Sequence, residues 1–316
     1  MQKKQLTVVA PVFNEKEVIE RFYLETKQVL ANLSDTYSTR LLFVVDRCSD
    51  GTTDILRRLA DTDRELQVLT LSSRFGHQMS LLAGIDYAQD ADVLIMMDSD
   101  LQHPPQLIPE LLRQHEKGND IVYTVRAENA DASALRKFTG NIFYRVLNYF
   151  TDIPVNANAA DFRLVTKRVA QIMRTGVRER NMFLRGLFTW IGFNQVAVEY
   201  VAAKRAGGTS KYSLSRMIAL ATAGILSFST RPLKLSIFVG LGFASLSFLM
   251  GIATLGAYFV NRSIPSGWTT IVMLLLLFSG VQLIVLGILG AYIGGIYEEV
   301  KARPHYIVDE AINFLP

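Results

Sequence analysis

The segment Val93–Pro105, VLIMMDSDLQHPP, decides the fold that we predict. Val93–Met97 is an apolar run with the length of a buried strand. It passes directly into a polar loop in which Asp98 and Asp100 are spaced i and i+2. The segment therefore predicts a strand that ends in a pair of carboxylates.

The same succession of apolar run and polar loop recurs along the first half of the chain, with amphipathic stretches between. The other strands that we predict are Leu6–Ala10, Leu41–Val45, Leu66–Leu71 and Ile121–Val125. The helices that we predict are Lys16–Leu33, Thr53–Thr62, Met79–Ala88 and Gln106–Glu116. This alternation is typical of an α/β domain with a mostly parallel sheet. Because ligands bind at the carboxyl ends of such strands, we expect the loops to converge on one site.

Composition narrows the classes of function. The single cysteine, Cys48, excludes an internal disulfide framework, and the four scattered histidines have no zinc-binding spacing. The net charge of +4 is compatible with a nucleic-acid partner, but beside apolar segments it favours an anionic membrane surface. We therefore expect a lipid bilayer as partner and no nucleic acid. The N-terminus has no secretory signal pattern.

Two apolar stretches near the C-terminus, Leu233–Val260 and Trp268–Tyr297, each exceed the roughly 20 residues that cross a bilayer core. The alternative is a pair of buried core helices, but long uncharged runs with glycine and small residues favour lipid. Lys and Arg residues precede the first stretch and follow the second, whereas the connection has only Arg262. The positive-inside rule therefore predicts an integral protein of the cytoplasmic (inner) membrane with both termini cytoplasmic.

These observations divide the chain into four parts. We expect a cytoplasmic catalytic domain over residues 1–210, two transmembrane helices over 232–298 and a cytoplasmic C-terminal tail over 299–316. Residues 211–231 have apolar side chains at helical spacing, which indicates an amphipathic helix on the membrane surface or a helix packed on the soluble domain. Small-residue spacings such as Gly240–Ala244 and Gly287–Ala291 favour a homo-oligomer.

The carboxylate pair after the fourth predicted strand has the chemistry of a metal site. Asp98 and Asp100 can reach one hard cation while leaving positions open for phosphate oxygens. A divalent ion there neutralises charge on a departing diphosphate. A lone Asp-x-Asp also arises by chance in surface loops, so the buried strand before it is what favours the functional interpretation.

Seven motifs in order resemble one family. They are VAPVFNEKE (residues 9–17), DGT (50–52), SRFGHQ (73–78), DSDLQHPP (98–105), ADFR (160–163), NMFLRG (181–186) and RAGGTSKY (205–212). Together with the two apolar spans, they make the chain similar to family-2 glycosyltransferases, in particular to the polyisoprenyl-phosphate glycosyltransferases. A processive polysaccharide synthase lacks support, because neither its Gln-x-x-Arg-Trp motif nor its further membrane helices are evident.

The resemblance implies a GT-A (Rossmann-like) catalytic domain with a C-terminal transmembrane hairpin, and inversion at the anomeric carbon. It implies that Asp98, Asp100 and Gln102 hold Mg²⁺ or Mn²⁺. The residues implied for the nucleoside pocket are Pro11, Asn14, Glu15 and Asp46, although Glu15 also suits the first turn of a helix. Arg47 departs from the family, where a glycine permits a tight turn, and this leaves nucleotide identity open.

Asp161 matches the position usually proposed as catalytic base. A phosphate monoester is already largely dianionic at pH 7, so we expect Asp161 mainly to orient the acceptor or the sugar. The alternatives are a general base and an Asp that caps the next helix.

Two anionic substrates require cations. The candidates are Arg126, Arg136, Arg205 and Lys211, with Arg185 as a weaker one. The loop from Arg205 to Lys211 is the one we expect to bind the lipid phosphate, because its glycines permit close backbone approach.

We therefore expect transfer of a hexose from a nucleotide-sugar donor, UDP-glucose first, to polyisoprenyl (undecaprenyl) phosphate at the cytoplasmic face. The alternatives are transfer from GDP-mannose to dolichyl phosphate and a decayed, non-catalytic nucleotide-sugar binder; the intact Asp98 and Asp100 argue against decay.

Overall fold

A computed structural model of the chain describes residues 3–127, 159–180, 182–201, 229–261 and 267–314. Arg136, Arg205 and Lys211, and most of the surface helix expected over 211–231, lie outside these residues.

The catalytic part is built on one sheet of eight strands in the order β7-β5-β6-β4-β1-β2-β3-β8. The strands are β1 (Lys4–Val12), β2 (Tyr37–Val45), β3 (Leu66–Leu71), β4 (Val93–Met96), β5 (Ile121–Arg126), β6 (Ala159–Thr166), β7 (Gln195–Tyr200) and β8 (Val308–Ile312). β6 and β8 run antiparallel to their neighbours, and the other pairings are parallel. The mostly parallel α/β fold is thus confirmed.

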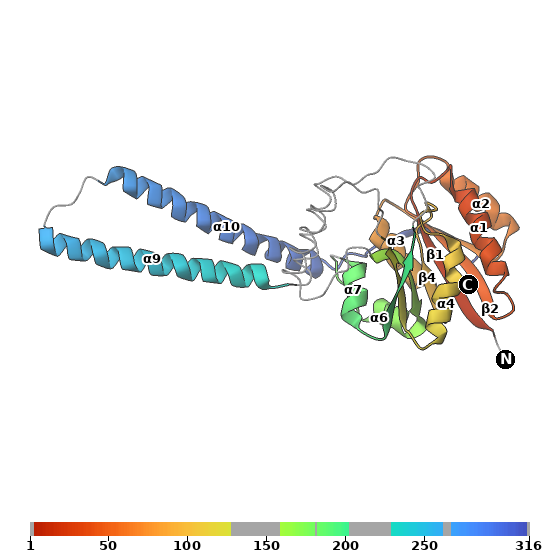
Figure 1. Ribbon diagram of the computed structural model, residues 1–316. Helices are drawn as coiled ribbons and strands as arrows, with labels where there is room; N and C mark the ends of the chain where they lie inside the picture. Colours follow the sequence, from red (N-terminus) through yellow and green to blue (C-terminus); the bar gives the residue numbers. More distant parts are fainter. Residues whose placement is uncertain (1–2, 128–158, 181, 202–228, 262–266, 315–316) are drawn as a thin grey trace.

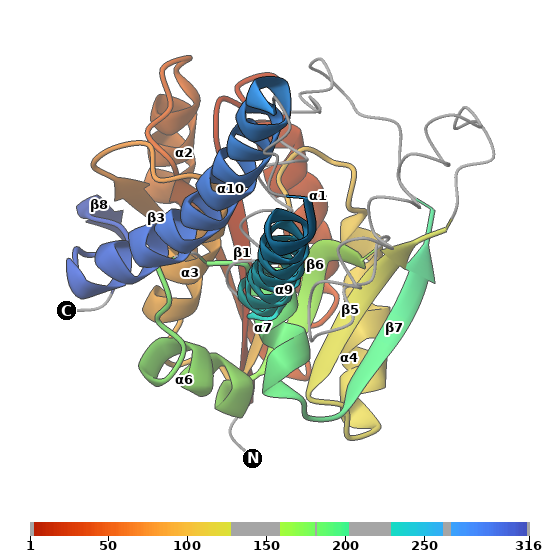
Figure 2. The same ribbon diagram turned by 90° about the vertical axis from the view of Figure 1, so that its left-hand side faces the viewer.

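Helices cover both faces of the sheet, as Figures 1 and 2 show. One face packs against α1 (Ile19–Ala31), α2 (Thr52–Thr62) and α4 (Ile108–Glu116), which follows the short helix η1 (Pro105–Leu107). The other face packs against α3 (His77–Tyr87), α6 (Lys167–Thr175) and α7 (Leu184–Ile191). Neighbouring β1 residues alternate between the two cores, since Val8 joins the first and Val9 the second.

The five predicted strands and four predicted helices are all confirmed, with ends shifted by a few residues. Sequence analysis missed β6, β7, α6 and α7. It also treated residues 299–316 as a tail, whereas Val308–Ile312 forms β8 and extends the sheet beside β3.

Two long helices, α9 (Arg231–Asn261) and α10 (Trp268–Val300), extend away from the catalytic part (Figure 1). Both are long and apolar enough to cross a membrane. Their most apolar windows are 6% and 0% buried, so they are not core helices. Large apolar side chains such as Phe238 and Leu283 are about 69% exposed, and water is a poor solvent for such a surface.

The close approach of α3 to β1 gives a stability prediction. A Cβ atom added to Gly84 would lie 2.2 Å from Cγ1 of Val9, a fully buried β-branched side chain with little freedom to move. We expect Gly84→Ala to lower the free energy of unfolding by about 1–3 kcal/mol, because overpacking outweighs the gain in helix propensity. Thermal unfolding in detergent measures the effect. Val9→Ala removes the clashing Cγ1 atom, so in that background Gly84→Ala should lower the free energy of unfolding by less. An equal loss of stability in both backgrounds contradicts this explanation.

Candidate functional site

A cavity of about 360 Å³ opens at the carboxyl ends of β1 to β4, within the size range of small-molecule sites. Its lining residues are Pro11, Val12, Phe13, Glu15, Asp46, Arg74, Gly76, His77, Ser80, Asp98, Ser99, Asp100, Asp161 and Arg185. The convergence of loops that the strand pattern predicts is therefore confirmed. β6 contributes Asp161 from its beginning, because it runs against β4.

The loops after β1 and β2 are joined by hydrogen bonds that fix one side of the cavity. Thr52 Oγ1 accepts the N–H of Glu15 at 3.1 Å, and Asp50 accepts the N–H of Lys16 at 3.1 Å. The carbonyl oxygen of Glu15 accepts the N–H groups of Val18 at 3.0 Å and Ile19 at 2.9 Å, so Glu15 lies immediately before α1. Asn14 does not line the cavity, since its amide oxygen accepts the N–H of Ser49 at 2.9 Å.

Asp46 lines the cavity and at the same time holds the loop between β3 and α3. Its two oxygens accept the N–H groups of Phe75 at 2.6 Å and Gly76 at 2.9 Å. The next residue, Arg47, has φ of 40°, a left-handed conformation that glycine adopts more readily. The turn is thus retained despite the substitution that sequence analysis singled out.

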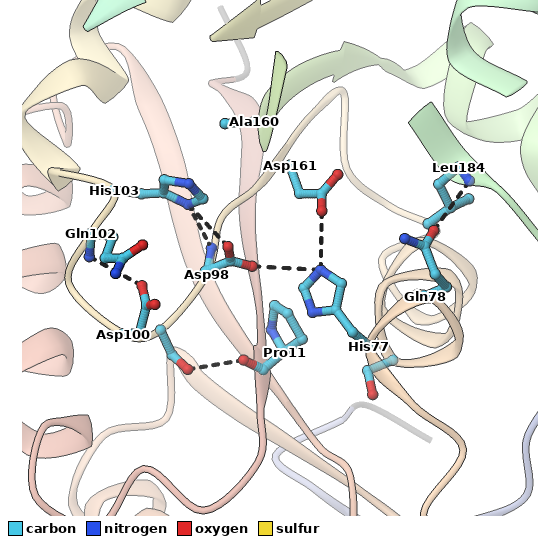
Figure 3. A network of polar contacts seen from close by, with 12 residues as sticks. Pro11, His77, Gln78, Asp98, Asp100, Gln102, His103, Ala160, Asp161 and Leu184 are labelled. Carbon is cyan, nitrogen blue, oxygen red and sulfur yellow. Dashed lines mark hydrogen bonds and ion pairs between the residues drawn. The ribbon is translucent and has the colours of Figure 1, made fainter. Parts of the chain in front are cut away.

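The Asp-x-Asp loop presents Asp98 and Asp100 to the same cavity (Figure 3). Oδ1 of Asp98 is buried and accepts no hydrogen bond, and the nearest positively charged group is the His77 ring, whose Nε2 lies 3.5 Å away. Asp100 Oδ1 accepts the N–H of Gln102 at 3.1 Å. Within the described residues no cluster of three or more Asp, Glu, His or Cys has metal-binding geometry. Two carboxylates suit a cation that also binds a substrate diphosphate.

Gln102 and Arg126 are not brought into this cavity. The side-chain oxygen of Gln102 accepts a hydrogen bond from Arg126 Nη2 at 2.9 Å, and Arg126 Nε donates to the Tyr200 hydroxyl at 3.1 Å. These contacts support the Asp-x-Asp loop from outside.

His77, which sequence analysis did not select, lies between two carboxylates. Its Nε2 is 3.5 Å from Asp98 Oδ1 and 3.4 Å from Asp161 Oδ2 (Figure 3). Burial lowers the pKa of His77, but the hydrogen bond to Asp161 and both negative charges outweigh it and raise the pKa to about 9. The ring is therefore a cation at neutral pH. Its position in the motif SRFGHQ, directly after β3, was the available signal.

Asp161 is paired with Arg185 from the first turn of α7. Arg185 Nε donates to Oδ1 at 2.8 Å and Nη2 donates to Oδ2 at 2.9 Å. Burial raises the pKa of Asp161, but Arg185 and His77 hold it well below its usual range. Asp161 lies inside β6, so it does not cap a helix. Both residues line the cavity, where Asp161 is a weak base and Arg185 is already engaged.

Arg74 adds a cation that sequence analysis overlooked. Its guanidinium carbon lies 4.0 Å from the centroid of the Phe13 ring, and both residues line the cavity. Stacking of this kind orients a guanidinium without neutralising its charge. The cavity thus combines the carboxylates of Asp98 and Asp100 with the positively charged side chains of Arg74 and Arg185.

His103 supports Asp98 from inside the protein. Its side chain is 1% exposed, and its Nδ1 accepts the backbone N–H of Asp98 at 3.1 Å. The ring stacks on Phe162 with centroids 5.4 Å apart and meets Tyr200 edge-on. Burial lowers the pKa of His103, consistent with a neutral ring that carries its proton on Nε2.

Comparisons with known proteins agree with this geometry. The family model described as glycosyl transferase family 2 matches residues 7–171. The uncharacterized glycosyltransferase YkcC of Bacillus subtilis is 39% identical, over 97% of this chain and 94% of the relative. The SfII prophage-derived bactoprenol glucosyl transferase of Shigella flexneri is 36% identical, over 97% and 98%. A prophage bactoprenol glucosyl transferase homolog of Escherichia coli is 34% identical, over 96% and 98%.

The role of His103 gives a prediction with a matched control. We expect His103→Phe to keep the ring packing but leave the Asp98 N–H unpaired, and to weaken Mn²⁺ binding by about ten-fold. In His103→Asn the amide oxygen can replace Nδ1, so affinity stays within about two-fold of wild type. Calorimetric titration of Mn²⁺ in the presence of UDP measures both. Equal affinities for the two variants rule out this hydrogen bond as the cause.

Proposed function

Because the chain belongs to glycosyltransferase family 2, and within it to the polyisoprenyl-phosphate glycosyltransferases, we propose that it transfers glucose from UDP-glucose to undecaprenyl phosphate. The observation that carries the proposal is the cavity in which Asp98, Asp100 and Asp161 meet the cations His77 and Arg185. Relatives named bactoprenol glucosyl transferases, matched over nearly their whole length, support glucose and a polyprenyl acceptor.

On the donor side, Asp98 and Asp100 would hold Mg²⁺ or Mn²⁺, and the presence of both carboxylates in one cavity supports this assignment. The bound ion supplies charge neutralisation for the diphosphate that departs. Glu15 and Asp46 lie on the side of the cavity expected for the nucleoside, where carboxylates accept hydrogen bonds from hydroxyl or N–H groups. Arg74 is placed in the same cavity to bind phosphate oxygens.

On the acceptor side, a phosphate oxygen of the lipid attacks the anomeric carbon as the bond from that carbon to the diphosphate oxygen breaks. The products are glucosyl-phosphoryl lipid, with inverted configuration, and UDP. The acceptor is already largely dianionic at pH 7, so no strong base is required. Asp161, held ionised by Arg185 and His77, orients the reacting groups. The two cations reduce repulsion between donor and acceptor.

The proposed setting is the cytoplasmic face of the membrane. The apolar, exposed surfaces of α9 and α10 support two spans, and the cations on either side of them support cytoplasmic termini. A homo-oligomer associated through small residues of these helices is part of the same proposal.

The reaction is tested with purified protein in detergent, UDP-glucose or GDP-mannose, and undecaprenyl or dolichyl phosphate, with and without EDTA. We expect mass spectrometry to detect glucosylated undecaprenyl phosphate, and EDTA to abolish it. Mannosylated lipid as the main product, or donor hydrolysis without any lipid product, contradicts the proposal.

A substitution tests the role of Asp161. We expect Asp161→Asn to lower turnover by about a hundred-fold, because Arg185 loses its partner and the reacting groups lose their alignment. UDP affinity should stay near wild type. Asp61→Asn, on the exposed face of α2, is the matched control and should leave turnover unchanged. If turnover of Asp161→Asn stays within a few-fold of wild type, Asp161 is not part of the catalytic machinery.

A further inference from the structure

The chain does not end at the second long helix but returns to the catalytic part. The helix α10 ends at Val300. Residues Glu299–Asn313, here called the C-terminal strap, begin in its last turn and run back along the edge of the sheet. Within the strap, β8 pairs antiparallel with β3, and Val68 faces Ile312 in the register. The membrane-directed helix is therefore continuous with a strand of the catalytic sheet.

The strap is held by several independent contacts along its length. Glu310 accepts two hydrogen bonds from Arg57, at 3.0 and 2.7 Å. The Asn313 side-chain amide donates to carbonyl oxygens of Ala60, Asp63 and Leu66, at 2.8 to 3.2 Å. Because these hydrogen bonds tie the strap to α2 and to the segment before β3, the strap is part of the folded domain and not a loose terminus.

The strap reaches the loop before α3, the helix that begins with His77. The carbonyl oxygen of Ile307 accepts the N–H of Ser72 at 2.9 Å, directly after β3. One residue earlier, the Tyr306 hydroxyl donates to Asp86 of α3 at 2.6 Å. The strap thus touches α3 near its end and the loop before its beginning, and His77 is the first residue of that helix.

A second connection leads to the loop before α7, the helix that carries Arg185. Glu299 accepts the backbone N–H of Arg180, between α6 and α7. In the same loop Arg178 forms two hydrogen bonds with Asp86, at 2.9 and 2.6 Å, the carboxylate that also binds Tyr306. Burial and the nearby Glu299 raise the pKa of Glu179, as expected where acidic groups are packed together.

The helices α3 and α7 are also joined to each other at the cavity. Gln78, in the first turn of α3, accepts the N–H of Leu184 at the beginning of α7 through Oε1 at 3.1 Å (Figure 3). His77 and Arg185, the neighbours of these two residues, both contact Asp161. The C-terminal end of α10 is therefore linked through the strap to the helices that carry His77 and Arg185, the two residues in contact with Asp161.

We propose that the C-terminal strap is a positioning element that fixes the orientation of the cavity relative to the bilayer, so that a lipid-borne phosphate reaches Asp161, His77 and Arg185. This inference rests on the proposed function. It assigns the strap to acceptor presentation, because its hydrogen bonds to Ser72 and Arg180 lead to the segments that precede His77 and Arg185. Transfer to a membrane-embedded acceptor then requires the strap to be continuous with α10, whereas donor binding does not.

The test uses full-length protein in lipid vesicles with a flexible Gly-Ser linker of about six residues inserted between Ala302 and Arg303. This insertion leaves β8 in the sheet but separates it from α10. A second variant adds Glu299→Ala, which removes the contact with Arg180. The matched control carries the same linker between Ser34 and Asp35, which are exposed and precede β2.

We expect the insertion to reduce transfer to vesicle-embedded undecaprenyl phosphate by about ten-fold, with a larger loss when Glu299→Ala is added. UDP affinity and the rate of transfer to a short-chain, water-soluble prenyl phosphate should remain within about two-fold of the control. The melting temperature should match that of the control. Undiminished transfer in vesicles overturns the proposal, as does an equal loss with the soluble acceptor. If the unmodified protein binds UDP-glucose but glycosylates neither acceptor, the proposed function itself fails.

Discussion

Two carboxylates from different segments approach one imidazole ring, and the rest of the site depends on this arrangement. Asp98 lies in the loop after β4 and Asp161 belongs to β6, yet both lie within 3.5 Å of His77. Negative charges brought together in a partly buried cavity repel unless cations separate them. His77 separates them on one side, and Arg185 neutralises Asp161 on the other. The cavity is therefore electrostatically arranged to hold positive charge beside anionic substrates.

The fold was predictable where the chain alternates simply between apolar strands and amphipathic helices. β1 to β5 are runs in which most buried residues are apolar, so their pattern identifies them despite buried polar residues such as Thr7 and Gln67. β6 was missed because Asp161 and Arg163 are both buried within it and interrupt the apolar pattern. β8 was missed because it is an edge strand, half exposed and containing Asp309 and Glu310. Both strands are stabilised by contacts with segments far away in the sequence, and a local sequence pattern cannot reveal such contacts.

The site was predictable to the extent that motifs follow predicted strands. Asp98 and Asp100 come after an apolar run, and the sheet places them in the cavity with Pro11, Glu15 and Asp46. Gln102 lies one turn farther on and faces Arg126 instead. His77 and His103 were not predicted as site residues, because isolated histidines have no characteristic spacing. The fold nevertheless brings both of them close to Asp98. Their roles depend on distances between segments far apart in sequence.

We propose that Asp98 and Asp100 hold a divalent cation where the donor diphosphate lies. The most direct measurement is a structure of the protein with Mn²⁺ and UDP, with anomalous scattering used to locate the metal. The account predicts one Mn²⁺ peak within bonding distance of both carboxylates and of the diphosphate, with the uracil toward Glu15 and Asp46. A diphosphate bound elsewhere, or a metal that contacts neither Asp98 nor Asp100, contradicts it.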